Sequence, residues 1–304
     1  MRDILFKEIE NKLNLDENTI ILTADLGYGI FEKIEKKYPK QFINVGVAEQ
    51  NLIGIGSGLA SEGKKVIVYS IANFPILRCL EQIRNDAAYH NVNMLIVSCG
   101  VGFTYGQLGV SHHLTEDISI MNSVPNVNIF SPAINQEITF LFKKVMKKNG
   151  LSYLRIDKRG LDIDNLKNNL FDKPLLLQKG KGVVIISTGT ILEESFKAAE
   201  VIKEKFNFKI SIISINNFSA KYLDELVKHI KSHKLIITLE EHNLNGGLGS
   251  IINNLVINRV KNFKYLKIKN IAIDNKFCSK IGDQKYLRKI NGIDSVSIVK
   301  IIVK

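Results

Sequence analysis

The chain has 304 residues, of which 45% are hydrophobic and 24% are charged, a composition typical of a globular protein with about two domains. No apolar run reaches the roughly 18–20 residues that a membrane crossing requires, so we expect no membrane partner. The formal charge of +12 comes mainly from lysine, without the arginine-rich, aromatic-interleaved stripes of nucleic-acid surfaces, so we expect no nucleic-acid partner.

The N-terminal segment, MRDILFKEIENKL, predicts a charged amphipathic helix. It lacks the continuous apolar core of a secretory signal. The three cysteines, Cys79, Cys99 and Cys278, are scattered without a CxxC pair, which argues against a disulfide framework or a cysteine–zinc site. Both features indicate a protein of the reducing cytoplasm.

Short apolar, β-branched runs alternate with amphipathic segments along most of the chain. The predicted strands are Ile20–Thr23, Val66–Ser70, Met94–Ser98, Val127–Phe130, Tyr153–Ile156, Val183–Ser187, Ile210–Ile215, Leu235–Leu239 and Leu266–Ile273. The predicted helices between them are Ala48–Ser61, Ile134–Lys148, Leu192–Phe206, Ala220–Lys231 and Gly249–Val260. Apolar strands separated by helices are typical of parallel sheets covered on both faces. We therefore predict an α/β fold with two parallel or mostly parallel sheets flanked by helices.

The segment Asn165–Lys181 divides this alternation. It is polar, contains one of the five prolines, and precedes a new run of strand and helix. We interpret it as the linker between a domain at residues 1–170 and a second domain at residues 175–304.

The stretch Phe42–Ala60 predicts a short extended piece that leads into a helix with Glu49 in its first turn. Each of Gly54, Gly56 and Gly58 costs the helix about 0.5–1 kcal/mol relative to alanine, which indicates close approach by a backbone or a ligand. Spacing alone favours an ordinary role for Glu49, which is to complement the helix dipole.

The sequence NVGVAEQNLIGIGSGLA within this stretch resembles the signature of the pyrimidine-binding domain of transketolases and related thiamine-diphosphate enzymes. Further resemblances follow in the family's order at Thr23–Gly27, Tyr69–Asp86, Ser111–Met121, Val124–Pro132, Val183–Glu194 and Leu239–Ser250. Together they cover nearly the whole chain. The resemblance implies a thiamine-diphosphate-binding fold followed by a transketolase C-terminal domain.

The resemblance also assigns residues to the cofactor. The family's motif Glu hydrogen-bonds the aminopyrimidine and promotes loss of the proton from the thiazolium carbon, which makes Glu49 the expected catalytic and cofactor-binding acid. In the family an aromatic ring stacks on the aminopyrimidine, and counting back from the EQIRN segment, Glu81–Asn85, gives Phe74, with Tyr69 nearby. Phe74 could instead be a core residue. Asp25, in the opening motif, is a further expected cofactor contact.

Two histidines stand at the end of a glycine-rich loop, which contains Gly100, Gly102, Gly106 and Gly109. His112 matches the family's loop histidine, which contacts substrate oxygens and moves protons near neutral pH, so it is expected to be catalytic and substrate-binding. His113 stands where the family usually has Gln, and it is a second expected substrate contact. No third ligand at a plausible spacing accompanies the pair, so we expect no metal site on this chain. The expected basic substrate contacts are Arg78 and Lys158, with Arg155 and Arg159 as alternatives to Lys158.

Several positions depart from ordinary transketolases. The Ser, His and Asp that hold a sugar phosphate there correspond here to Gly29, Gly100 and Leu108, and a second aromatic before the EQIRN segment is replaced by Leu80. Loss of polar donors weakens phosphate recognition. We expect two-carbon ketol transfer to an aldehyde acceptor other than the usual aldose phosphate.

The family's GDG motif, which marks the domain that binds Mg²⁺ and the cofactor's diphosphate, does not occur in the sequence. The chain therefore resembles the C-terminal half of a split transketolase. The resemblance implies thiamine diphosphate, Mg²⁺ ligands on a partner chain, and an α₂β₂ assembly. The alternatives are the β subunit of a 2-oxoacid dehydrogenase, a deoxyxylulose-phosphate synthase fragment, or a non-catalytic α/β partner.

Overall fold

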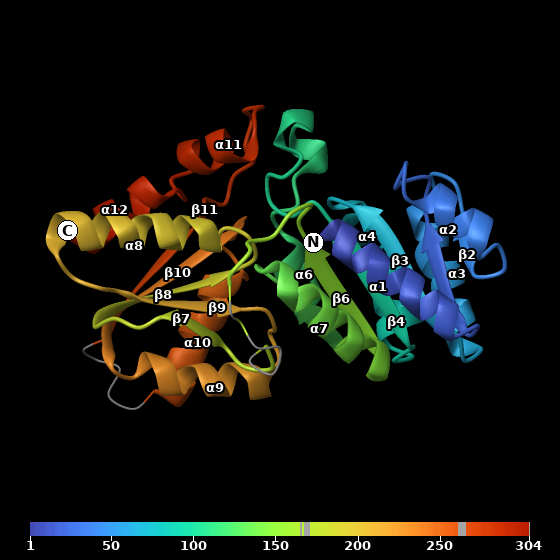
Figure 1. Ribbon diagram of the computed structural model, residues 1–304, viewed down its shortest axis with the longest axis horizontal. Helices are drawn as coiled ribbons and strands as arrows, with labels where there is room; N and C mark the ends of the chain where they lie inside the picture. Colours follow the sequence, from blue (N-terminus) through green and yellow to red (C-terminus); the bar gives the residue numbers. More distant parts are fainter. Residues whose placement is uncertain (165, 167–170, 261–265, 304) are drawn as a thin grey trace.

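The computed structural model describes residues 1–164, 166, 171–260 and 266–303 and confirms an α/β fold with two sheets (Figure 1). The first sheet has the order β2-β1-β3-β4-β6-β5, and all of its strand pairs are parallel. Its strands are β1 (Thr19–Thr23), β2 (Phe42–Asn44), β3 (Lys65–Ile71), β4 (Met94–Cys99), β5 (Val127–Phe130) and β6 (Leu151–Ile156).

Helices cover both faces of this first sheet because its strands carry apolar side chains on both sides. One buried cluster joins alternate strand residues such as Ile21 and Ile67 to α1 (Arg2–Leu15), α2 (Phe31–Lys37) and α7 (Asn135–Lys147). The other face packs against the helices α3 (Glu49–Ser61), α4 (Phe74–Leu77) and α6 (Asp117–Ser123). The result is three layers, with the carboxyl ends of all six strands at the same edge of the sheet.

The second sheet has the order β11-β10-β8-β9-β7. Four of its strands are parallel, and β7 pairs antiparallel with β9 at the sheet edge. Its strands are β7 (Leu175–Gln178), β8 (Gly182–Thr188), β9 (Ser211–Ile215), β10 (His233–Asn243) and β11 (Lys267–Ile273). Its helices are α8 (Leu192–Phe206) and α12 (Ser295–Val303) on one face, α9 (Ala220–Ile230) and α10 (Leu248–Arg259) on the other, and α11 (Gln284–Ile290) near α12 (Figure 1).

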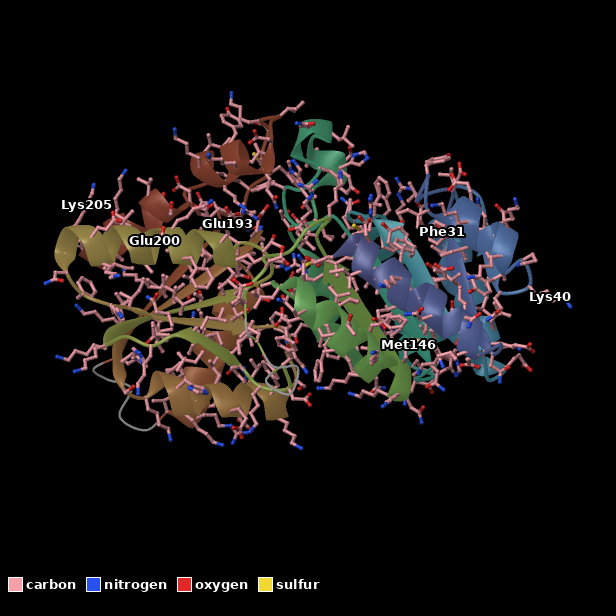
Figure 2. All side chains as sticks on the ribbon, viewed as in Figure 1. Phe31, Lys40, Met146, Glu193, Glu200 and Lys205 are labelled. Atoms are coloured by element: carbon pink, nitrogen blue, oxygen red, sulfur yellow. The ribbon has the colours of Figure 1, made fainter. Side chains whose placement is uncertain are left out.

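The two halves share buried contacts. The cluster on the α3 face of the first sheet continues into side chains of the second sheet, such as Ile186, and into α9 and α10. Glu193, Glu200 and Lys205 follow α8 from its start near the junction of the halves to its outer end (Figure 2). The start of α8 therefore lies close to the first domain.

The predicted strands and helices differ from the observed ones mainly at their ends. The segment interpreted as a linker contains β7, and its residues 165 and 167–170 lie outside the described residues. The domain boundary near residues 170–175 remains a prediction.

The EQIRN segment lies in a short helix, α5 (Leu80–Gln82), which continues as a π-helix over Ile83–Ala88. No helix among the described residues is long and apolar enough to cross a membrane.

Candidate active site

The candidate site lies at the carboxyl edge of the first sheet. β3 leads into Phe74 and Arg78, β4 leads into the glycine-rich loop that carries His112, β6 leads into Lys158, and β2 leads into the helix that starts at Glu49. Because these strands are parallel, their carboxyl ends lie at the same edge. Open α/β sheets bind ligands at this edge.

Glu49 is held at the start of α3 with only 5% of its surface exposed. The chain enters this helix through Gly46, whose φ of +71° favours glycine. The Glu49 carboxylate accepts a hydrogen bond from Nη1 of Arg78, with 2.7 Å between Nη1 and Oε1. The carboxylate therefore lies both at the positive end of the helix dipole and beside a guanidinium.

Phe74 connects this ion pair to the glycine-rich loop. The guanidinium carbon of Arg78 lies 4.1 Å from the centre of the Phe74 ring. On the loop side, the His112 ring lies 5.0 Å from the same ring, with 67° between the two planes. Phe74 is half-buried, so it is not a core residue. The structure thus brings four of the predicted residues, Glu49, Phe74, Arg78 and His112, into one connected group.

The two histidines face different surroundings. His112 is half-buried, and burial together with the nearby Arg78 charge lowers its pKa below the ordinary value. His113 is 4% exposed and packs edge-on against Phe103, with 4.9 Å between ring centres. Burial also lowers the pKa of His113. His113 lines a pocket together with Asn73 and Leu77, and its contact with substrate remains a prediction.

Tyr105 is a site residue that the sequence analysis missed. Its ring lies over Gly100, where an added Cβ would be 2.0 Å from a ring carbon, and Gly100 has a φ of +99°. The Lys158 ammonium lies 4.3 Å from the Tyr105 ring centre, and the His112 ring lies 6.4 Å from it. Burial raises the pKa of Tyr105 to about 12, which keeps its hydroxyl protonated. An aromatic residue within a run of glycines is the only signal in the sequence.

Other predicted residues lie elsewhere. Tyr69 is 2% exposed and packs against Phe6 and Phe31 on the α1 side of the sheet, so it cannot stack on a cofactor, which corrects that prediction. Arg155 is buried and ion-paired with Asp117, so it is not an alternative to the exposed Lys158 and Arg159. Asp25 has a φ of +54°, and its amide donates to Asn44 in the loop after β1.

The second domain supports the glycine-rich loop through buried charges. The Glu241 carboxylate accepts hydrogen bonds from the Phe103 amide and from Nε of Arg288, each at 2.6 Å. Asp157 accepts hydrogen bonds from Thr104 on the loop and from Thr190 in the second domain. Burial and the Glu241 charge raise the pKa of Asp157. These contacts position the loop that carries His112.

The group around Glu49 fits a planar, nitrogen-bearing ring. A buried carboxylate and an aromatic face already hold one planar hydrogen-bonding group, the Arg78 guanidinium, between them. An aminopyrimidine presents the same kind of flat, donor-bearing surface.

Among the described residues, no group of three or more His, Cys, Asp or Glu side chains is placed to hold a metal ion.

Comparisons with known proteins agree with this layout. Family models match residues 1–162 (“Transketolase, pyrimidine binding domain”) and residues 172–297 (“Transketolase, C-terminal domain”). A putative transketolase C-terminal section from Methanocaldococcus jannaschii is 34% identical over 294 residues, 95% of this chain and 90% of that protein. An apulose-4-phosphate transketolase subunit from Actinobacillus succinogenes is 30% identical over 87% of this chain and 84% of that protein. A solved structure described as “Split gene transketolase, inactive beta4 tetramer” covers 98% of this chain and 95% of that chain, with a TM-score of 0.83 and 24% identity.

Proposed function

The chain belongs to the transketolase family, and on this premise we propose that it is the pyrimidine-binding subunit of a two-chain transketolase. Together with a partner chain it transfers a two-carbon ketol unit to an aldehyde acceptor. When bound, thiamine diphosphate supplies the electron sink for breaking and forming the carbon–carbon bond. This chain supplies the groups that bind and orient the cofactor and move protons.

The observation that carries the proposal is that Glu49 and Phe74 share one planar partner, the Arg78 guanidinium. Glu49 offers a carboxylate at the start of a helix, with 5% of its surface exposed. Phe74 offers a half-buried ring that already stacks with a planar group. We assign Phe74 to stacking on the aminopyrimidine and Glu49 to holding a proton at one of its ring nitrogens. Asp25 remains a proposed contact from the loop after β1.

His112 is the proposed substrate-side acid and base. Its lowered pKa keeps the imidazole largely neutral near pH 7, so it can accept as well as donate a proton. Its edge contact with Phe74 places it beside the proposed pyrimidine site. Lys158, stacked over Tyr105, is the proposed basic contact for a polar substituent of the substrate.

A partner chain is part of the proposal because the metal and the diphosphate need ligands. We propose that the partner carries the GDG motif and binds Mg²⁺, in an α₂β₂ assembly. Exposed apolar side chains near the site support a covering partner, since large apolar patches mark interaction surfaces. They are Leu77, Leu80, Leu108, Val110, Phe277 and Ile281. A relative whose printed name calls it a subunit points the same way.

We also propose that the acceptor differs from the usual aldose phosphate. Gly29, Gly100 and Leu108 offer no side-chain hydrogen-bond donor, and Tyr105 fills the space beside Gly100. Each missing charge-assisted hydrogen bond is worth roughly 1.5–3 kcal/mol, so losing two would cost about 10²-fold or more. A relative named for apulose-4-phosphate supports variation in the sugar.

The test is to mix this chain with a GDG-containing partner and assay ketol transfer to ribose 5-phosphate and to other aldehydes. We expect transfer only in the mixture, with ribose 5-phosphate a poor acceptor. Efficient use of ribose 5-phosphate would contradict the acceptor assignment. Decarboxylation of a 2-oxoacid would favour a dehydrogenase subunit, and cofactor binding without any turnover would favour a non-catalytic partner.

A further inference from the structure

Arg78 contacts both of the residues that we assign to the pyrimidine ring, Glu49 and Phe74. We propose that its guanidinium is a built-in placeholder, which satisfies Glu49 and covers Phe74 until the cofactor binds and then swings outward. This inference rests on the proposed binding of the aminopyrimidine between Glu49 and Phe74.

The two contacts of Arg78 are those that the cofactor ring would make. Nη1 donates to Oε1 of Glu49 at 2.7 Å, and the same guanidinium lies 4.1 Å from the centre of the Phe74 ring. A face that already carries one planar group at stacking distance cannot accept a second one. The guanidinium and the pyrimidine ring therefore exclude each other.

The placeholder has a physical purpose before the cofactor arrives. A carboxylate that is 5% exposed is costly unless it is paired or hydrogen-bonded. Among the described residues, Arg78 is the ion-pair partner of Glu49 and the only side chain that hydrogen-bonds it. Arg78 thus offsets the cost of burying the acid at the start of α3.

Arg78 is also able to leave. Its side chain is 48% exposed, whereas that of Glu49 is 5% exposed. It follows the last residue of the four-residue α4, and the described residues give it no other ion pair. Rotation of the arginine into solvent would open the site without moving Glu49 or Phe74. The same rotation would draw its positive charge away from His112, whose pKa that charge helps to lower.

The competition makes a measurable prediction for cofactor affinity. In the assembled two-chain protein, Arg78→Ala should bind thiamine diphosphate with Mg²⁺ about fivefold more tightly than the unmodified protein, equivalent to ~1 kcal/mol. Titration calorimetry without substrate gives this affinity independently of turnover. Arg84→Ala is the matched control, because Arg84 is exposed in the same segment and its side chain hydrogen-bonds only Asn85 among the described residues. Its affinity should not change.

A second variant separates the placeholder from a general charge effect. In the Glu49→Gln background the guanidinium loses its ion pair, so adding Arg78→Ala should give a clearly smaller gain in cofactor affinity.

If the alanine variant folds poorly, Arg78→Gln replaces it. This variant retains a polar side chain of similar reach and should also bind the cofactor more tightly than the unmodified protein. An unchanged or weaker affinity in both Arg78 variants, or an equal gain in the Glu49→Gln background, would overturn the placeholder. Absence of binding in the unmodified complex would overturn the proposed function and the placeholder with it.

Discussion

The proposed role of Glu49 depends on the acidic proton of its side chain and not on the shape of that side chain. Its place at the start of α3 and its burial are set by the backbone, and its carboxylate accepts a hydrogen bond from Arg78, which in turn lies over the Phe74 ring. Glutamine has almost the same shape but cannot exchange a proton. A change from acid to amide therefore tests the chemistry and leaves the packing intact.

Glu49→Gln should fold normally, bind thiamine diphosphate in the presence of the partner, and lose turnover by about 10²–10⁴-fold, the usual contribution of one positioned proton-transfer group. Steady-state ketol transfer and calorimetry on the same preparation give the two quantities. Glu62→Gln, at the exposed residue that follows the last residue of the same helix, is the control and should keep full activity. Turnover in Glu49→Gln close to that of the control would remove the role assigned to this residue.

His112 should determine the acid limb of the pH–rate profile. Burial, the main cause of its lowered pKa, does not depend on the position of Arg78, so the imidazole stays neutral until the pH falls below the ordinary histidine value of 6.5. Protonation below that pH removes the proton acceptor, so kcat/KM should fall on the acid side only below pH 6.5. His112→Ala should lower kcat and abolish that limb, with a smaller change in cofactor affinity.

The measurement is a pH profile of kcat/KM for both proteins, combined with a cofactor titration. The opposite pattern, in which His112→Ala loses cofactor affinity and keeps its rate and acid limb, would mean that the loop is misplaced.

At the scale of elements, the glycine-rich loop after β4 determines how His112 and Tyr105 are presented. Gly100 begins the loop in a left-handed conformation, and the Tyr105 ring lies where its Cβ would be. Further along the loop, Gly102 also has a positive φ, and an added Cβ would be 2.5 Å from Glu241. The loop is therefore shaped by close approach of side chains from two directions.

Gly100→Ala should destabilise the protein more than Gly63→Ala does. Both glycines have positive φ, at +99° and +87°, but an added Cβ at Gly63 meets nothing within 4 Å. The shared backbone strain cancels in the comparison, and the overlap with Tyr105 should add about 1–3 kcal/mol. Urea unfolding of the two variants measures the difference. Equal stabilities would show that Tyr105 moves aside at no cost.

The elements themselves were largely predictable from apolar runs. β5 and α8 have the predicted bounds because their apolar pattern starts and stops sharply. β7 was missed because it is a short edge strand that follows Pro174, inside a polar segment, and it pairs on one side only. The side that a strand residue faces depends on register, which is why Tyr69 was placed in the site but packs in the core.

The residues of the candidate site were predictable where they lie within a short sequence motif. Glu49, Phe74 and His112 lie in motifs a few residues long, so the resemblance could point to each of them separately. Tyr105 and the pair of Glu241 with Arg288 were missed because their roles arise from contacts between distant segments. The same holds for the ion pair of Arg78 with Glu49, which spans 29 positions of the sequence.

At the scale of the whole molecule, both halves position the residues of the candidate site at the carboxyl edge of the first sheet. The second domain holds the glycine-rich loop through Glu241 and Asp157, and the carboxyl edge of the first sheet carries the proposed pyrimidine site. The apolar side chains beside that edge, such as Leu77 and Phe277, are exposed. This arrangement suits a protein whose site is completed by another chain.

The most direct test of this account is a titration of thiamine diphosphate and Mg²⁺ into the isolated chain and into its mixture with a GDG-containing partner, followed by a ketol-transfer assay on each. We predict no tight binding and no turnover for the isolated chain, because the proposed ligands for Mg²⁺ and the diphosphate lie on the partner. The mixture should show both binding and turnover. Tight, magnesium-dependent binding together with ketol transfer by the isolated chain would contradict the two-chain account.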